Sequence, residues 1–148
     1  MQILIAEATG VLSSLLSRNG MEQFQLTASQ PAFAPPASLF SIVWSILYAL
    51  MGISAARILL ATPTSNKHKS INLYITQLIV NFFWSLIFFN AGAYASAFIW
   101  LLLLWILVLM MAVRMYQTDK LAGLIQIPYI LWLTFAGILN FYDWQLNR

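Results

Sequence analysis

The chain has 148 residues, of which 61% are hydrophobic and only 7% are charged, and its formal net charge at pH 7 is +3. So few charged residues cannot form the water-facing shell of a soluble fold, which excludes that class of protein. The basic residues that ordinarily flank membrane spans account for the net charge, so no nucleic-acid partner is needed to explain it. The sequence therefore predicts an integral membrane protein whose solvent is lipid.

The first predicted element is a short helix over residues 2–17. At 1.5 Å per residue it reaches only about 25 Å, enough to cross a bilayer only where the bilayer is thin. A secretory signal peptide is the alternative, and the lack of basic residues before the apolar stretch argues against it. The helix carries Glu7, which is either a functional acid at membrane depth or, as we favour, a carboxyl near the cytoplasmic end that reaches water.

Four longer apolar blocks follow, and each has about the 20 residues that a helix needs to cross a ~30 Å hydrocarbon layer. They lack the alternation typical of barrel strands. The sequence thus predicts an all-α integral membrane protein, a five-helix transmembrane bundle in one domain, with a Pro-rich loop over residues 18–37 between the first two helices. The predicted helices cover residues 2–17, 38–60, 71–89, 94–116 and 121–141.

Basic residues gather in and beside the second and fourth predicted linkers, residues 61–70 and 117–120, which lie on one side of the membrane. Five of the seven Lys and Arg residues lie there, namely Arg57, Lys67, Lys69, Arg114 and Lys120. The positive-inside rule then places the N-terminus in the cytoplasm, and the Pro-rich loop and the C-terminus outside. A bacterial cell membrane fits this bias.

Aromatic and amide side chains recur on one face of three predicted spans, at helical spacings of three and four residues. These faces hold Trp44, Tyr48, Met51 and Ala55 in the second span, Tyr74, Gln77, Asn81, Trp84 and Phe88 in the third, and Tyr129, Trp132, Ala136 and Asn140 in the fifth. An unsatisfied amide in lipid costs a few kcal/mol, so the faces should turn inward. The amides then either join helices or contact a ligand, and the tryptophans either form an interfacial belt or line a pocket. Aromatic faces beside a few neutral polar groups are typical of a site for a flat, mostly apolar ligand.

Three motifs follow one another along these faces. They read Pro35-Pro36 with Phe40-x-x-Val43-Trp44-x-x-Leu47-Tyr48-x-x-Met51-Gly52, then Tyr74-x-x-Gln77-Leu78-x-x-Asn81-x-x-Trp84-x-x-x-Phe88-Phe89, then Pro128-Tyr129-x-x-Trp132-x-x-Phe135-Ala136-x-x-Leu139-Asn140. Together they resemble the translocator protein family of tryptophan-rich sensory proteins. The resemblance implies a five-helix bundle, commonly a homodimer, with a pocket beneath the first linker that accepts porphyrins and other planar hydrophobic molecules.

The resemblance also implies site residues by motif position. Trp44 and Trp132 match pocket tryptophans of the family, and Phe33 stands where its loop commonly has a tryptophan. With the neighbouring positions on the same faces, the expected ligand-binding set is Phe33, Trp44, Tyr48, Asn81, Trp84, Trp132, Ala136, Leu139 and Asn140. A cholesterol pattern traced as Leu139-x-x-Tyr142-x5-Arg148 is too permissive to predict sterol binding.

Groups for acid–base or metal chemistry are scarce. The chain has no Cys and one His, His68, in a charged linker, so we expect no metal site, no cofactor and no axial ligand for a haem iron. Among the acids, Asp143 lies at the exit of the last span with Arg148 nearby.

Three functions stay open. The first, which we favour, is a receptor or translocator that binds porphyrin, as in tetrapyrrole sensing or transport. The second is an enzyme that degrades porphyrin oxidatively in light, with Trp44 and Trp132 as redox partners. The third is a structural protein whose amides only join helices.

Overall fold

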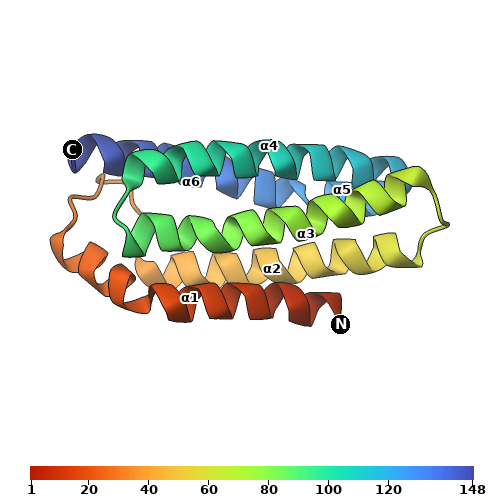
Figure 1. Cartoon of the computed structure of the whole chain (residues 1–148), viewed down its shortest axis with the longest axis horizontal. Helices are drawn as coiled ribbons and strands as arrows, with labels where there is room; N and C mark the ends of the chain where they lie inside the picture. The colour runs from red at the N-terminus through yellow and green to blue at the C-terminus, as the bar shows by residue number, and fades with distance from the viewer.

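The computed structural model describes residues 1–148 and contains only helices. They are α1 (Gln2–Thr27), α2 (Ala37–Leu60), α3 (Ser65–Ser85), the π-helical segment η1 (Leu86–Asn90), α4 (Tyr94–Thr118), α5 (Lys120–Leu124) and α6 (Ile127–Leu146). Figure 1 shows the long helices side by side along one axis, with α5 and α6 sharing one leg of the bundle. Short connections make helices that follow one another in the chain antiparallel.

The bundle has two distinct ends (Figure 1). The N-terminus, residues 61–64 and the α4–α5 junction lie at one end, which we call the basic end. Residues 28–36, the turn before α4 and the C-terminus lie at the other, which we call the loop end.

Four helical segments are long and apolar enough to cross a membrane. They are Ala37–Leu60, Ser65–Asn90, Tyr94–Thr118 and Lys120–Leu146. α1 has 26 residues but is less apolar and is not among them. The all-α class is therefore confirmed.

α1 differs most from the prediction, because it continues past residue 17 to Thr27 and shortens the linker to residues 28–36. The apolar pattern stops at Arg18, yet the polar residues that follow still form helix, with an exposed pair between Arg18 and Glu22 at 3.4 Å. The added turns bring Met21 and Phe24 to the loop end. The predicted first helix was therefore too short, and the wall that it supplies extends further than expected.

The other predicted helices differ mainly at their ends. α3 begins at Ser65 rather than at residue 71, because the Thr64 hydroxyl accepts a hydrogen bond from the Lys67 N–H at 3.2 Å and caps the helix. The last predicted helix is divided into two helices, because α5 ends at Leu124 and α6 starts at Ile127. Pro128 has no N–H to donate to the preceding turn, which ends a continuous helix at this point.

α1 and α2 approach closely through two glycines. A Cβ at Gly52 would collide with the backbone of Ile3, and a Cβ at Gly10 would collide with the Tyr48 ring. Polar side chains join α1 to α3: the Ser13 hydroxyl donates to the Phe82 carbonyl at 3.1 Å. The inner face of α1 therefore combines small and hydroxyl side chains, which explains its weaker apolar signal.

At the basic end, charged side chains connect neighbouring helices through hydrogen bonds and an ion pair. The Lys67 ammonium donates to the Leu59 and Ala61 carbonyls at 2.7 and 2.9 Å, at the C-terminal end of α2. Asp119 caps α5 and pairs with the Arg57 guanidinium at 2.8 Å. Partial burial alone would raise the pKa of Asp119, but the backbone N–H of Ala122 and the Arg57 guanidinium outweigh it and hold that pKa below its ordinary value.

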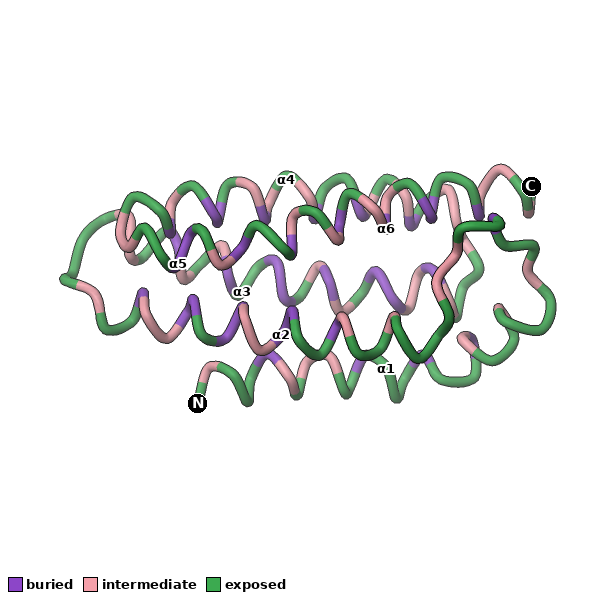
Figure 2. The backbone as a smooth tube through the Cα atoms, turned by 180° about the vertical axis from the view of Figure 1, so that it is seen from behind, coloured by how far each residue is buried: buried purple, intermediate pink, exposed green.

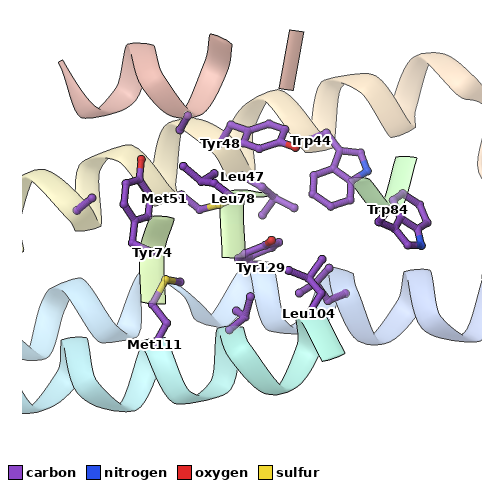
Figure 3. Close-up of a cluster of buried hydrophobic side chains, with 14 of the residues drawn as sticks. Trp44, Leu47, Tyr48, Met51, Tyr74, Leu78, Trp84, Leu104, Met111 and Tyr129 are labelled. Carbon is purple, nitrogen blue, oxygen red and sulfur yellow. The ribbon is translucent and has the colours of Figure 1, made fainter. Parts of the chain in front are cut away.

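Buried residues lie along the axis of the bundle, as Figure 2 shows. All the residues of the predicted second- and third-span faces are buried, from Trp44 to Ala55 and from Tyr74 to Phe88. Figure 3 shows side chains of the core, including Tyr48 on α2, Tyr129 on α6 and Met111 on α4. The inward orientation of these faces is therefore confirmed.

Candidate functional site

A cavity of about 360 Å³ lies at the loop end, beneath residues 28–36. Its walls come from α1, α2, α3 with η1, α6 and the segment above it. The lining residues are Met21, Phe24, Gln25, Gln30, Ala34, Pro35, Pro36, Ala37, Phe40, Ser41, Trp84, Phe88, Phe89, Ala136, Leu139, Asn140 and Asp143. A concave site of this size, mostly apolar with a few polar groups, suits a small organic ligand.

A second cavity of about 220 Å³ adjoins it deeper between α1, α2 and α3. The two share the lining residues Met21, Phe40, Ser41, Trp84 and Phe89. The smaller cavity adds Trp44, Tyr48 and Asn81 from the predicted set. The two cavities therefore adjoin along these residues, with Trp84 lining both, and we call them the joined cavities.

Stacked and tilted rings build the wall around Trp84. Its ring centroid lies 6.4 Å from that of Trp44, with 32° between the planes, and 5.4 Å from that of Phe88 at 29°. Figure 3 shows the Trp44 and Trp84 indoles close to each other, one from α2 and one from α3. Phe88 belongs to η1, which ends at Asn90. The turn that follows contains Gly92, whose φ of +58° glycine adopts without strain.

Trp84 also links three segments through hydrogen bonds. Its indole N–H donates to Asn140 Oδ1 at 3.3 Å, and Asn140 Nδ2 donates to the Tyr94 carbonyl at 2.8 Å. Trp84 and Asn140 thus hold α3, α6 and the start of α4 together while both face the larger cavity. The two residues join helices and line the cavity at once.

A second chain of polar contacts lies deeper. Asn81 Nδ2 donates to the Tyr129 hydroxyl at 2.8 Å, that hydroxyl donates to Gln77 Oε1 at 2.8 Å, and Gln77 Nε2 lies 3.4 Å from the Met51 sulfur. Gln77 lines neither cavity, so its amide joins helices. Asn81 lines the smaller cavity while its amide bonds to Tyr129. Its amide therefore joins helices and also faces the cavity.

Seven of the nine predicted site residues line the joined cavities. Trp84, Ala136, Leu139 and Asn140 line the larger one, and Trp44, Tyr48, Asn81 and again Trp84 line the smaller one. Phe33 and Trp132 line neither.

Trp132 lies behind the cavity wall. Its ring packs on Phe40 at 5.7 Å and on Phe135 at 5.3 Å, and Phe40 stands between it and Trp44. The Trp132 indole N–H is buried without a hydrogen-bond partner. The two tryptophans predicted as pocket partners therefore flank one phenylalanine instead of facing each other.

Phe33 holds the segment above the cavity. Its ring meets Tyr142 of α6 edge-on at 5.3 Å. Nearby, Asn147 makes two hydrogen bonds to Ser29, accepting from its N–H at 2.9 Å and donating to its carbonyl at 2.8 Å. Residues 28–36 are thus fastened to the end of α6 at two points.

Sequence reasoning missed several wall residues. Met21 and Phe24 were assigned to a linker, and Phe89 of η1 was not given a role. Asp143 was placed at an exit beside Arg148, but it is 5% exposed, makes no ion pair and lines the larger cavity. Its position three residues after Asn140 on the same helical face was the signal that could have placed it inside.

The family model described as the TspO/MBR family matches residues 2–145 of the chain. The chain belongs to this family. It is 40% identical over 119 residues to Protein CrtK of Rhodobacter capsulatus, covering 80% of this chain and 74% of that one. It is 32% identical over 144 residues to the tryptophan-rich protein TspO of Chlorobaculum tepidum (95% and 89%) and 28% identical over 147 residues to the translocator protein of Bos taurus (98% and 87%).

TspO/MBR membership and the four apolar spans together identify an integral, multi-pass membrane protein of the translocator class. The resemblance read from the three motifs is confirmed. The lined cavities give this TspO/MBR protein a place to hold a ligand.

Proposed function

We propose that the chain is a membrane receptor or translocator that binds planar hydrophobic ligands, chiefly porphyrins, in the joined cavities, with a role in tetrapyrrole sensing or transport. The observation that carries this proposal is the position of Trp84. It lines both cavities, and its ring packs against Trp44 at 32° and against Phe88 at 29° between the planes. A mostly apolar cavity wall built of aromatic rings favours a flat ring system through aromatic contacts and burial of apolar area.

Residues 28–36 act as the cover of this site. Pro31, Pro35 and Pro36 restrict the backbone of the segment, which lowers the entropy lost when it closes over a ligand. The contacts of Ser29 and Phe33 with α6 keep it over the larger cavity. A ligand enters or leaves when these contacts open.

A titration in the dark tests the proposal. Protoporphyrin IX is added to the purified protein in a nonionic detergent, and tryptophan fluorescence is followed. We expect saturable quenching, about tenfold weaker affinity in Trp84→Phe because stacking area is lost, and little change in Trp132→Phe because that indole lies behind Phe40. Absence of saturable quenching in the unmodified protein would remove the porphyrin proposal.

An enzyme that degrades porphyrin in light is the second candidate. The observation that favours it is the row Trp44, Phe40, Trp132, with ring centroids 6.1 and 5.7 Å apart. Such a row would carry an electron from an indole toward a photoexcited porphyrin, with dioxygen as the oxidant. Illumination of the complex decides between the two: bleaching to a new product that Trp132→Phe abolishes identifies the enzyme, and an unchanged porphyrin spectrum identifies the binding protein.

We also propose that α1 crosses the membrane as a fifth span, with the N-terminus in the cytoplasm. At 26 residues α1 is about 39 Å long, more than the ~30 Å hydrocarbon core requires. Its Ser17 hydroxyl is buried against that of Ser85 at 2.9 Å, so polar groups face the bundle and not lipid. The chain has no cysteine, so single substitutions Ser29→Cys and Thr62→Cys can be labelled in intact cells with an impermeant maleimide. We expect labelling at Ser29→Cys only, and the reverse pattern would contradict the orientation.

A further inference from the structure

Acidic side chains are the only charged groups that line the joined cavities. Asp143 lines the larger cavity and Glu7 lines the smaller one, and no Lys, Arg or His belongs to either wall. The two ion pairs of the protein, Arg18 with Glu22 and Arg57 with Asp119, involve neither acid. The site therefore has an acidic character from one part to the other.

Asp143 has no partner within the protein. The residue is 5% exposed, and its Oδ1 atom is buried without a hydrogen bond. No donor of the cavity wall is hydrogen-bonded to this carboxyl, and two of them are used elsewhere: the Trp84 N–H donates to Asn140, and the Asn140 amide donates to the Tyr94 carbonyl. A buried carboxyl without a donor is costly, and a donor that enters the cavity and reaches the carboxyl through its other oxygen, Oδ2, lowers that cost.

We propose that Asp143 makes the site selective for charge: it accepts a hydrogen bond or an ion pair from an N–H or ammonium group of a planar aromatic ligand and excludes ligand carboxylates from the same place. The inference rests on the proposed binding of planar ligands in these cavities. For a tetrapyrrole it means that the acid side chains are esterified, amidated or turned away from Asp143.

The physical reason is that Asp143 attracts a ligand ammonium and repels a ligand carboxylate. An ammonium beside Asp143 forms a charge-assisted hydrogen bond in a mostly apolar cavity, where such bonds are stronger than in bulk water. A ligand carboxylate would instead place like charge against Asp143, or force one of the two acids to take up a proton. Glu7 acts in the same direction from the smaller cavity but is only partly buried, so water screens it more.

The test uses two flat aromatic probes that differ mainly in charge, 1-pyrenemethylammonium and 1-pyrenecarboxylate. Energy transfer from tryptophan to pyrene reports binding in a nonionic detergent, whose micelles add no charge of their own. In the unmodified protein we expect the ammonium probe to bind roughly tenfold or more tightly than the carboxylate probe. This ratio needs no variant, so it can overturn the inference alone: equal affinities, or tighter binding of the carboxylate, would do so.

Two variants assign the selectivity to its residue. Asp143→Asn keeps the size of the side chain and removes its charge, and we expect the ratio of the two affinities to fall to about threefold or less. Glu22→Gln is the matched control, because it removes an exposed acid of α1 that lines neither cavity, and we expect it to leave the ratio unchanged. A ratio that is the same in Asp143→Asn and in the unmodified protein would contradict the role of Asp143.

Protoporphyrin IX and its dimethyl ester complete the experiment. We expect the ester to bind more tightly than the free diacid and Asp143→Asn to narrow the difference. If the ammonium probe binds selectively and neither porphyrin binds, the porphyrin proposal fails and the charge selectivity stands. If both porphyrins bind equally and the pyrene probes show no preference, the charge selectivity fails and the porphyrin proposal stands.

Discussion

The two ends of the bundle are held together in different ways. At the basic end, Asp119, Arg57 and Lys67 cap helices and form an ion pair and short hydrogen bonds. At the loop end, aromatic rings surround a mostly apolar cavity in which Asp143 keeps a buried carboxyl oxygen without a partner. Buried atoms without a partner also occur on Arg57 at the basic end and on Gln126 between α5 and α6, so the ends differ in the lining of their cavities: the cavity at the basic end is lined mostly by polar residues. Charged groups that pair with one another fix a structure, whereas a mostly apolar cavity lined by aromatic rings offers contacts to an organic ligand. We therefore expect the basic end to anchor the bundle, and we propose that the loop end binds the ligand.

The largest expected effect comes from separating α1 and α2 near the basic end. In Gly52→Ala the new Cβ meets the backbone of Ile3, which cannot move as a flexible side chain would, so we expect a loss of about 2–3 kcal/mol of unfolding free energy. Gly137→Ala is the control, because its Cβ meets only Leu101 Cδ2 at an ordinary 3.8 Å. Thermal unfolding in detergent measures both, and equal stability of the two variants would contradict the close packing.

Filling the larger cavity should affect binding more than stability. Ala136 is 3% exposed and lines the cavity, so Ala136→Leu places new atoms where a ligand would lie. We expect about tenfold weaker binding of a planar ligand, about 1.4 kcal/mol, with the melting temperature little changed. Gly137→Ala, one residue along on the outer face, should bind as the unmodified protein does. Unaltered affinity in Ala136→Leu would move the ligand out of this cavity.

Removing Asp119 tests the basic end. Asp119→Ala loses both the α5 cap and the pair with Arg57, and we expect it to cost about 1–2 kcal/mol at pH 7. The pKa of Asp119 is lowered in the folded state, so its contribution is present above its ordinary pKa and is lost as the pH falls below about 4. Melting curves between pH 7 and pH 3 should therefore converge for the variant and the unmodified protein. A difference that stays constant with pH would contradict the charged role, and Glu22→Ala serves as the exposed-acid control.

The smallest effect on stability should come from the fastening of residues 28–36. Asn147→Ala removes two hydrogen bonds to Ser29, and we expect a loss below about 1 kcal/mol together with severalfold faster ligand release. Stopped-flow dissociation measures the rate. Asn19→Ala, on the exposed side of α1, is the control, and equal release rates in the two variants would show that the segment is not the cover of the site.

The sequence predicted best where a pattern reports burial directly. The periodic faces of α2 and α3 are buried from end to end, because amides and aromatic side chains at spacings of three and four can only be satisfied inside the bundle. α1 was predicted less well. The inner face of α1 packs closely through its own Ser13 and Ser17 and against Gly52 of α2. Small and polar residues at such positions produce no periodic pattern of apolar residues in the sequence.

The residues of the candidate site also differ in how well periodicity predicts their positions. Trp44, Trp84 and Asn140 line the cavities because they lie on the periodic faces of α2, α3 and α6. Trp132 lies on such a face too, but Phe40 from α2 stands before it, and which of two aromatic side chains reaches a cavity depends on helix rotation that spacing does not specify. Asp143 looked exposed because it lies near the end of α6, whereas residues 28–36 cover that end.

Ligand protection of single cysteines tests the central claim most directly, because it reports where a planar molecule binds. Ser41→Cys places a thiol on the wall shared by the two cavities, and Thr134→Cys places one on the outer groove between α4 and α6. Labelling with N-ethylmaleimide is timed in detergent with and without saturating protoporphyrin IX dimethyl ester. We predict that the ligand slows labelling of Ser41→Cys at least tenfold and leaves Thr134→Cys unchanged. Protection of Thr134→Cys alone would place the ligand on the outer surface and contradict a binding site at the loop end.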